Sequence, residues 1–228
     1  MKMYRKLLPA AILCSGAAYL IAMAAENLLL RWILKPGTVL LIIALALTAV
    51  PFSRVYRRLM LAGLGFSVVG DALLLLPGNQ WFALGVGSFL IAHVFYIFAL
   101  LTRRRPTLVR LLSLLPIAAY GVGLLTGLHD GMFASPGNGS LWIPIVVYVA
   151  VISVMVWTAV LSGSRSAAIG SILFFLSDSL LAWNKFVTPM AWAGYGVMVT
   201  YYLAQYLMAR SVEAPRLIPS SARVAGSR

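Results

Sequence analysis

Residues Leu141–Leu161 read LWIPIVVYVAVISVMVWTAVL, an apolar stretch without a charged side chain. A helix that crosses the hydrocarbon core of a bilayer needs about 20 mostly apolar residues, so this stretch predicts a membrane-spanning helix. Seven similar runs lie on either side of it, separated by charged residues, Pro and Gly. They are Leu7–Ala25, Gly37–Phe52, Leu59–Leu76, Trp81–Leu101, Leu108–Leu128, Ala167–Lys185 and Pro189–Ala209. We therefore expect an all-α membrane protein, with eight transmembrane helices in one bundle over residues 1–209.

The composition supports this class and excludes others. Of the 228 residues, 62% are hydrophobic and 10% are charged, against about 25% charged in a soluble domain. The mean hydropathy is +0.95. These values exclude a soluble globular domain and a disordered chain. A single cysteine, Cys14, excludes a disulfide framework, and we expect neither a metal nor another cofactor.

The net charge of +13 is interpreted as a signal of membrane topology rather than of nucleic-acid binding. Most Lys and Arg residues precede the first run, follow the last one or occupy every second loop, and only Arg31, Lys35 and Lys185 lie on the other side. Loops rich in Lys and Arg stay in the cytoplasm. Both termini are therefore expected in the cytoplasm, with the protein in a bacterial cytoplasmic (inner) membrane. The basic tail 210–228 contains Pro and Ser and is expected to be disordered.

The first run permits a second interpretation. A basic start, an apolar stretch and Ala22-Met23-Ala24 resemble a cleaved signal peptide. The apolar stretch is long for a signal peptide, so we expect a membrane span. The longest connection, His129–Ser140, contains Gly131, Pro136 and Gly139 and is expected to be a loop.

An internal repeat is one interpretation of a shift that places Asp71 on Asp178. The same shift places Gly63 on Gly170 and Gly87 on Gly194. A parallel repeat of four plus four helices would relate the two halves by an axis along the membrane normal, and could bring the two aspartates face to face. Chance is the alternative, because Gly and Leu are abundant.

Asp71 and Asp178 are the two acidic residues that lie inside predicted spans. An ionised side chain in the bilayer core costs about 2.5–3.5 kcal/mol on insertion scales, so each needs a structural or functional reason. One interpretation is a buried hydrogen bond to a neighbouring helix. The other is a carboxyl pair that shares a proton, because two neighbouring carboxylates in a buried site do not both ionise. Their similar depth and sequence contexts favour the pair.

Several other polar residues are candidates for substrate binding or support. Lys35 and Lys185 lie near the outer surface, where either could bind a phosphate; an ion pair between Lys35 and Glu26 is the alternative. His93 could orient water or a carboxyl group, or could simply link two helices. The remaining candidates are Tyr96, Ser67 and Ser177.

These residues resemble the YhhN-like, or lysoplasmalogenase, family of membrane proteins. The resemblance rests on Phe66-Ser67-x-x-Gly70-Asp71-x-Leu73-Leu74, on Gly85, Phe89, His93 and Tyr96, on Lys35-Pro36, and on Phe175-x-Ser177-Asp178-x-x-Leu181-Ala182. It implies an eight-helix bundle that hydrolyses the vinyl ether bond of lysoplasmalogens to a fatty aldehyde and a glycerophospho-ethanolamine or -choline. It also implies that Asp71 and Asp178 are the essential aspartates. The substrate would then be a lysophospholipid among membrane lipids, and no nucleic acid is expected as a partner.

The chemistry of a vinyl ether agrees with a carboxyl pair. Its hydrolysis needs an acid that protonates carbon, a carboxylate near the resulting cation and a base that directs water, as in glycosidases. The sequence does not indicate which aspartate is the acid, nor the oligomeric state. A proton- or cation-coupled transporter is the main alternative, because paired membrane carboxylates also relay protons. A non-catalytic scaffold would leave both aspartates unexplained.

Overall fold

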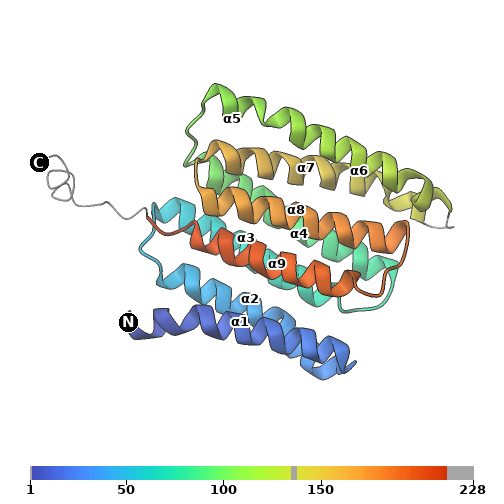
Figure 1. Ribbon diagram of the computed structural model, residues 1–228, viewed down its shortest axis with the longest axis horizontal. Coiled ribbons are helices and arrows are strands. Elements are labelled where there is room, and N and C mark those ends of the chain that lie inside the picture. The colour runs from blue at the N-terminus through green and yellow to red at the C-terminus, as the bar shows by residue number, and fades with distance from the viewer. Residues whose placement is uncertain (1, 135–137, 215–228) are drawn as a thin grey trace, which may run out of the picture.

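The computed structural model describes residues 2–134 and 138–214, and this part of the chain is a bundle of helices (Figure 1). The helices are α1 (Lys2–Ala24), α2 (Leu28–Thr48), α3 (Arg54–Leu73), α4 (Asn79–Leu101), α5 (Leu108–Leu112), α6 (Leu114–Ala134), α7 (Trp142–Leu161), α8 (Arg165–Phe186) and α9 (Ala193–Arg210). A 3-10 turn, η1 (Asn138–Leu141), precedes α7. No strand occurs within the described ranges; a single isolated bridge pairs Pro51 with Glu213. The predicted all-α class is confirmed.

Six segments are long and apolar enough to cross a membrane: α1, α2, α4, the continuous stretch 108–134, α7 and α8. They identify an integral membrane protein. Helices α3 and α9 do not reach this standard, because α3 begins with several arginines and α9 carries Tyr201, Tyr202 and Gln205. Both polar helices nevertheless lie among the apolar ones in the bundle (Figure 1). For these two helices, the eight-span arrangement stays a prediction.

Two sequence-based boundaries are wrong. The second helix begins at Leu28 rather than at Gly37, because Asn27 caps it: its side-chain oxygen accepts from the Leu30 N–H at 3.0 Å. Lys35 therefore lies inside the helix and does not precede it.

The segment after residue 128 is the second case. His129 and Asp130 lie on α6, which continues to Ala134. Gly131 allows α6 to approach the backbone of Phe186 so closely that a side chain would not fit. The segment therefore remains helical although its composition suggests a loop. Residues 135–137 of the expected loop lie outside the described residues.

The connections alternate between the two ends of the bundle (Figure 1). Segments 49–53, 102–107 and 162–164 lie at the same end as the start of α1 and the end of α9. At this end the chain after α9 packs back on the bundle: the Phe52 N–H donates to the Val212 carbonyl at 2.8 Å, and the Ala214 N–H to the Val50 carbonyl at 3.0 Å. The first residues of the expected tail are thus ordered, and residues 215–228 lie outside the described part.

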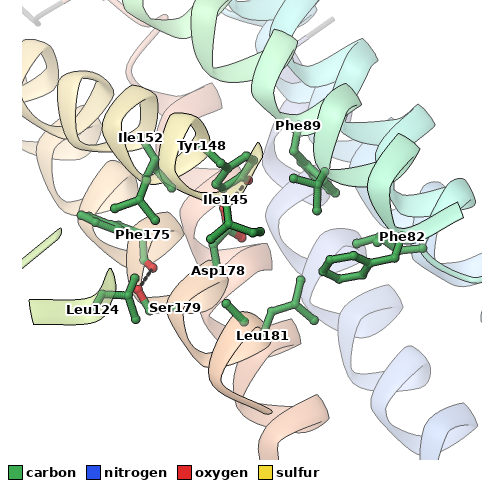
Figure 2. Close-up of a pocket in the computed structure, with 14 residues that line it drawn as sticks. Phe82, Phe89, Leu124, Ile145, Tyr148, Ile152, Phe175, Asp178, Ser179 and Leu181 are labelled. Carbon is green, nitrogen blue, oxygen red and sulfur yellow. Dashed lines mark hydrogen bonds between the residues drawn. The ribbon is translucent and has the colours of Figure 1, made fainter. Parts of the chain in front are cut away.

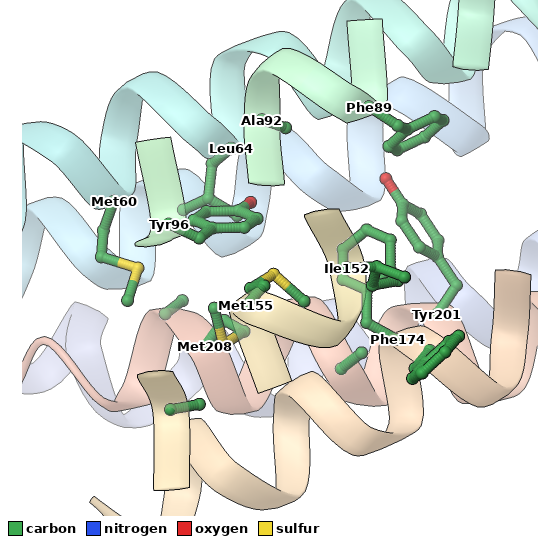
Figure 3. Close-up of a cluster of buried hydrophobic side chains, with 14 of the residues drawn as sticks. Met60, Leu64, Phe89, Ala92, Tyr96, Ile152, Met155, Phe174, Tyr201 and Met208 are labelled. Atoms are coloured by element: carbon green, nitrogen blue, oxygen red, sulfur yellow. The ribbon is translucent and has the colours of Figure 1, made fainter. Parts of the chain in front are cut away.

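Much of the core lies between α3, α4, α7, α8 and α9 (Figure 3), and α1, α2 and α6 add buried side chains such as Tyr19, Ile42 and Leu128. Glycines let these helices pack closely. A Cβ on Gly63 would overlap the ring of Tyr96 on α4, and one on Gly170 would lie 3.0 Å from the Ala204 carbonyl oxygen on α9. The shift of 107 residues that places Asp71 on Asp178 also places Gly63 on Gly170. Each of these glycines allows close packing of the next helix in the chain, α4 on α3 and α9 on α8.

Candidate active site

Asp71 and Asp178 line one cavity of about 370 Å³. Its lining includes Met23 near the end of α1, Phe82 near the start of α4 and Lys185 near the end of α8, so it lies toward the end of the bundle opposite the start of α1. Helices α1, α2, α3, α4, α8 and α9 contribute to its wall. Its polar lining consists of Tyr19, Arg31, Lys35, Asp71, Ser177, Asp178, Asn184, Lys185 and Tyr201. Two carboxyl groups and three cations from distant parts of the sequence therefore share one space.

Asp71 is 1% exposed and is held by two partners. Lys35 Nζ lies 3.6 Å from Asp71 Oδ1, and the Tyr201 hydroxyl donates to Asp71 Oδ2 at 2.7 Å. Gln205 Nε2 in turn donates to the Tyr201 oxygen at 3.2 Å, and its Oε1 accepts from the Tyr96 hydroxyl at 2.9 Å. A chain of buried side chains on α4 and α9 thus fixes the carboxyl on α3.

Lys35 projects from the interior of α2 and is itself buried, at 7% exposure. The alternative of a Lys35–Glu26 ion pair is wrong, because Lys35 pairs with Asp71. Glu26 is exposed in the turn between α1 and α2, with a left-handed backbone (φ 51°). Arg31 lies one turn before Lys35 on α2, and its buried Nε has no hydrogen-bond partner among the described residues.

Asp178 has a different environment. The Tyr148 hydroxyl, on α7, donates to Asp178 Oδ2 at 2.5 Å. His93 Nε2, on α4, lies 3.9 Å from the same oxygen. The Asp178 side chain keeps 15% of its exposure, so it is more open than Asp71.

His93 is fully buried, and neither ring nitrogen has a hydrogen-bond partner within the part of the chain that the structure describes. The rings of Phe174 and Tyr148 pack edge-to-face on it, with centroids 4.7 and 5.2 Å away. Buried polar atoms are normally hydrogen-bonded. The His93 imidazole is thus a buried polar group that stays unpaired among the described residues, beside the Asp178 carboxyl group.

The remaining candidates divide between the cavity and its support. Lys185 lines the cavity, donates to Asn79 Oδ1 at 3.1 Å and lies over the ring of Phe82. Ser177 also lines it, with its hydroxyl donating to the Val197 carbonyl.

Two candidates lie behind the cavity wall. The Ser67 hydroxyl donates to the Gly63 carbonyl on its own helix, and lies 3.4 Å from the Tyr96 hydroxyl. Tyr96 supports Gln205 and does not line the cavity. Both residues therefore act on Asp71 through other side chains, and neither touches the space that the carboxyl groups share.

A second, smaller hollow of about 30 Å³ adjoins the first and is almost entirely apolar (Figure 2). The two share Asp178, together with Leu74, Phe82, Phe89 and Leu181. Figure 2 shows Tyr148 and Asp178 beside Ile145, Ile152 and Phe175. Asp178 therefore lies at the border between a polar and an apolar space, whereas Asp71 lines the polar one alone.

Sequence reasoning missed Tyr201, Tyr148 and Arg31. One signal for Tyr201 was present: the shift that superposes the aspartates places it one residue from His93. Arg31 was counted as a loop charge because α2 was expected to begin later; four residues from Lys35 on a helix, it faces the same side. Nothing in the sequence singles out Tyr148.

Comparisons with known proteins match the chain to one family. The model of the YhhN family matches residues 30–212. Pig (Sus scrofa) lysoplasmalogenase TMEM86B is 37% identical over 156 residues, which cover 68% of this chain and 63% of that protein. The lysoplasmalogenase of Mycobacterium tuberculosis is 30% identical over 187 residues, or 79% of this chain and 70% of that protein. The match to the pig protein thus spans less than two thirds of its length. No solved structure gives a significant match.

Proposed function

The chain belongs to the YhhN family, and on this premise we propose that it is a membrane-embedded hydrolase of the vinyl ether bond in lysoplasmalogens. The products are a fatty aldehyde and a glycerophospho-ethanolamine or -choline. The observation that carries the proposal is the cavity that holds Asp71 and Asp178 between cationic side chains and an apolar hollow. The names of the relatives support the same substrate class.

The charges in the cavity suggest how a phosphate is held. Lys35 is engaged with Asp71, which leaves Arg31 and Lys185 as cations toward the outer end. Arg binds phosphate oxygens through several N–H groups, and Lys acts as a point charge. A headgroup bound there would direct the hydrocarbon chain toward the apolar hollow next to Asp178.

The two carboxyl groups then take different roles. In a vinyl ether, the carbon that accepts the proton lies on the hydrocarbon side of the C–O bond. Asp178 borders the apolar hollow and hydrogen-bonds to a neutral hydroxyl, so we assign it as the acid. Asp71 is paired with a lysine and is assigned as the carboxylate that stabilises the adjacent oxocarbenium ion.

In the remaining steps, the site regains the proton that Asp178 gives to the substrate. After Asp178 protonates the alkene carbon that is farther from the ether oxygen, water from the polar cavity adds to the oxocarbenium carbon. The Asp178 carboxylate, or His93 at 3.9 Å from it, takes the proton that this water loses. The resulting hemiacetal then breaks its C–O bond: its hydroxyl loses a proton to become the aldehyde carbonyl, and the leaving oxygen gains one to become the glycerol hydroxyl. The residues described here suffice for these steps.

A four-plus-four repeat would place the two carboxyl groups in related positions with different neighbours. Asp71 receives one group from the second helix of its half, Lys35 on α2, and Asp178 one from the corresponding helix, Tyr148 on α7. Each aspartate also faces the last helix of the opposite half: Tyr201 on α9 hydrogen-bonds Asp71, and His93 on α4 lies next to Asp178. Different residues on corresponding helices would thus divide one symmetric site into acid and carboxylate.

The test is aldehyde release by the purified protein from a lysoplasmalogen, comparing wild type with Asp71→Asn and Asp178→Asn. Asn keeps the shape and loses the ionisable carboxyl group. Asp130→Asn is the matched control, because Asp130 is exposed on α6. We expect release from wild type and the control, and a loss of at least about 10³-fold in both site variants, since such paired groups act as a unit. No release by wild type across headgroups and pH values would overturn the proposal.

The orientation and location are part of the proposal. Most arginines of the described residues lie in or near the segments at the end of the bundle where α1 begins and α9 ends, so we place that end on the cytoplasmic side of a bacterial inner membrane. The cavity then faces the outer leaflet. A transport function has no support among the described residues or the relatives named above.

A further inference from the structure

A third hollow lies on the side of the bundle, between α6, α7 and α8. It is a groove of about 210 Å³ lined by Pro116, Ile117, Tyr120, Val156, Ile172, Phe175 and Leu176. Ile172 and Leu176 are 45% and 43% exposed. In a membrane protein, such a groove opens to lipid, because side chains that face away from the bundle meet the bilayer.

Phe175 connects this groove to the interior. Its side chain lines both the groove and the apolar hollow that borders Asp178 (Figure 2). Phe175 is 5% exposed, and its ring packs edge-to-face on that of Tyr120, with centroids 4.9 Å apart at 85°. One aromatic ring on α8 therefore forms part of the wall between the reaction site and the bilayer.

The hollows follow one another along α8. Lys185 lines the polar cavity, Asp178 borders the polar cavity and the apolar hollow, and Ile172 lines the groove. At 1.5 Å per residue, Asp178 lies about 10 Å from Lys185 and about 9 Å from Ile172 along the helix axis. This order, from cation through carboxyl to lipid-facing groove, matches the order of groups in a single-chain ether phospholipid.

The apolar hollow is too small for a long hydrocarbon chain. Its volume is about 30 Å³, and one water molecule already needs about 10–15 Å³ of such space. A long chain that starts at Asp178 must therefore continue elsewhere. The groove on the other face of Phe175 offers that continuation.

We propose a lateral passage beside Phe175 and Tyr120, through which the hydrocarbon chain of the substrate leaves the reaction site and enters the bilayer. This inference rests on the proposed function. It makes Phe175 a determinant of chain length. A larger apolar groove of about 410 Å³ between α1 and α9 is the competing place for the chain, but it shares no lining residue with either internal hollow.

Photolabelling tests the passage without catalysis. The probe is a saturated alkyl-ether lysophospholipid, which lacks the vinyl bond, with a diazirine at the end of its chain. After irradiation in vesicles, we expect labelled peptides from 116–120 and 172–176. Labelling confined to 9–20 and 199–206, at the competing groove, would overturn the proposal.

Phe175→Trp is the variant that tests the passage, because its larger ring would narrow the space beside position 175. Labelling at 116–120 is expected to fall about ten-fold, the size of effect that one added group has in a shaped apolar pocket. Phe98→Trp is the control, since Phe98 is 55% exposed on α4 and lines none of the three hollows. Equal labelling in Phe175→Trp and Phe98→Trp would contradict the role of Phe175.

Chain-length kinetics separate the passage from the proposed function. For lysoplasmalogens with a long and a four-carbon alkenyl chain, Phe175→Trp should lower the long-to-short ratio of kcat/KM about ten-fold. A loss of the same size for both chains would refute the passage. If wild type cleaves neither lipid, the proposed function fails, while the labelling experiment still decides whether a lipid chain occupies the groove.

Discussion

Replacing Lys35 with Met would test whether the buried ion pair with Asp71 holds the bundle together. Both side chains are almost fully buried, at 9% and 1% exposure, and the Nζ–Oδ1 distance is 3.6 Å. At this distance and an effective dielectric constant of about 20, the attraction amounts to about 4–5 kcal/mol. Removing one partner of a buried pair costs about 3–5 kcal/mol, because the other charge stays buried without compensation.

The Tyr201 hydroxyl still donates to Asp71 in the variant, and uptake of a proton by Asp71 would relieve part of the cost. We therefore expect a loss in the free energy of unfolding of about 3 kcal/mol, near the lower end of that range. For a chain of this size, this loss corresponds to a decrease in Tm of about 6–12 °C. Thermal unfolding in detergent, followed by tryptophan fluorescence, measures it.

Two further variants complete the test. Lys35→Met combined with Asp71→Asn removes both charges and should recover most of the stability, since replacing a whole buried pair is often neutral. Lys185→Met removes a partly exposed lysine and should cost at most about 1 kcal/mol. If Lys35→Met unfolds at the wild-type temperature, or if the double variant is less stable than it, the ion pair does not stabilise the fold as reasoned here.

Three more predictions concern the site and its frame. Tyr148→Phe removes the hydroxyl that donates to Asp178, so kcat for aldehyde release should fall about 10–100-fold with the fold intact; wild-type turnover would contradict the assigned contact. Arg31→Gln should raise KM about ten-fold for a lysoplasmalogen, since a charged hydrogen bond is worth about 1.5–3 kcal/mol, and should leave KM for a phosphate-free vinyl ether unchanged; equal effects on both substrates would rule out phosphate binding. Gly170→Ala places a Cβ 3.0 Å from the Ala204 carbonyl oxygen, so thermal unfolding should show a loss of about 1–3 kcal/mol; an unchanged Tm would show that α8 and α9 move apart freely.

The helices could be predicted from the sequence because lipid leaves a spanning chain few alternatives. Backbone groups in the bilayer must hydrogen-bond within the segment, so long apolar runs become helices. Errors occurred where local chemistry outweighed hydropathy: Asn27 starts α2 early despite Pro36, and α6 continues through the Gly131 contact. Their consequence was chemical, because Arg31 and Lys35 were expected outside the helix that in fact carries them.

The aspartates could be identified because each is costly in a membrane, and that cost is visible in one dimension. Their partners are set by helix packing, which is not visible in the sequence alone. Tyr148 and Tyr201 resemble the many tyrosines of membrane helices, and only the approach of α7 to α8 and of α9 to α3 brings their hydroxyls to a carboxyl group. Tyr96 was expected at the site and instead supports it from behind, through Gln205.

The polarity of α3 and α9 also bears on how the protein is made. Neither helix is apolar enough to enter the bilayer readily alone, yet each packs against an apolar neighbour in the chain, α4 or α8. If α3 enters the membrane together with α4, and α9 together with α8, the apolar helix of each pair would carry the polar one into the bilayer. Since Tyr201 is on α9, Asp71 gains its hydroxyl partner only after the last helix has joined the others. A chain whose synthesis has not yet reached α9 therefore carries an incomplete site, in which Asp71 has its Lys35 partner but lacks its hydroxyl partner.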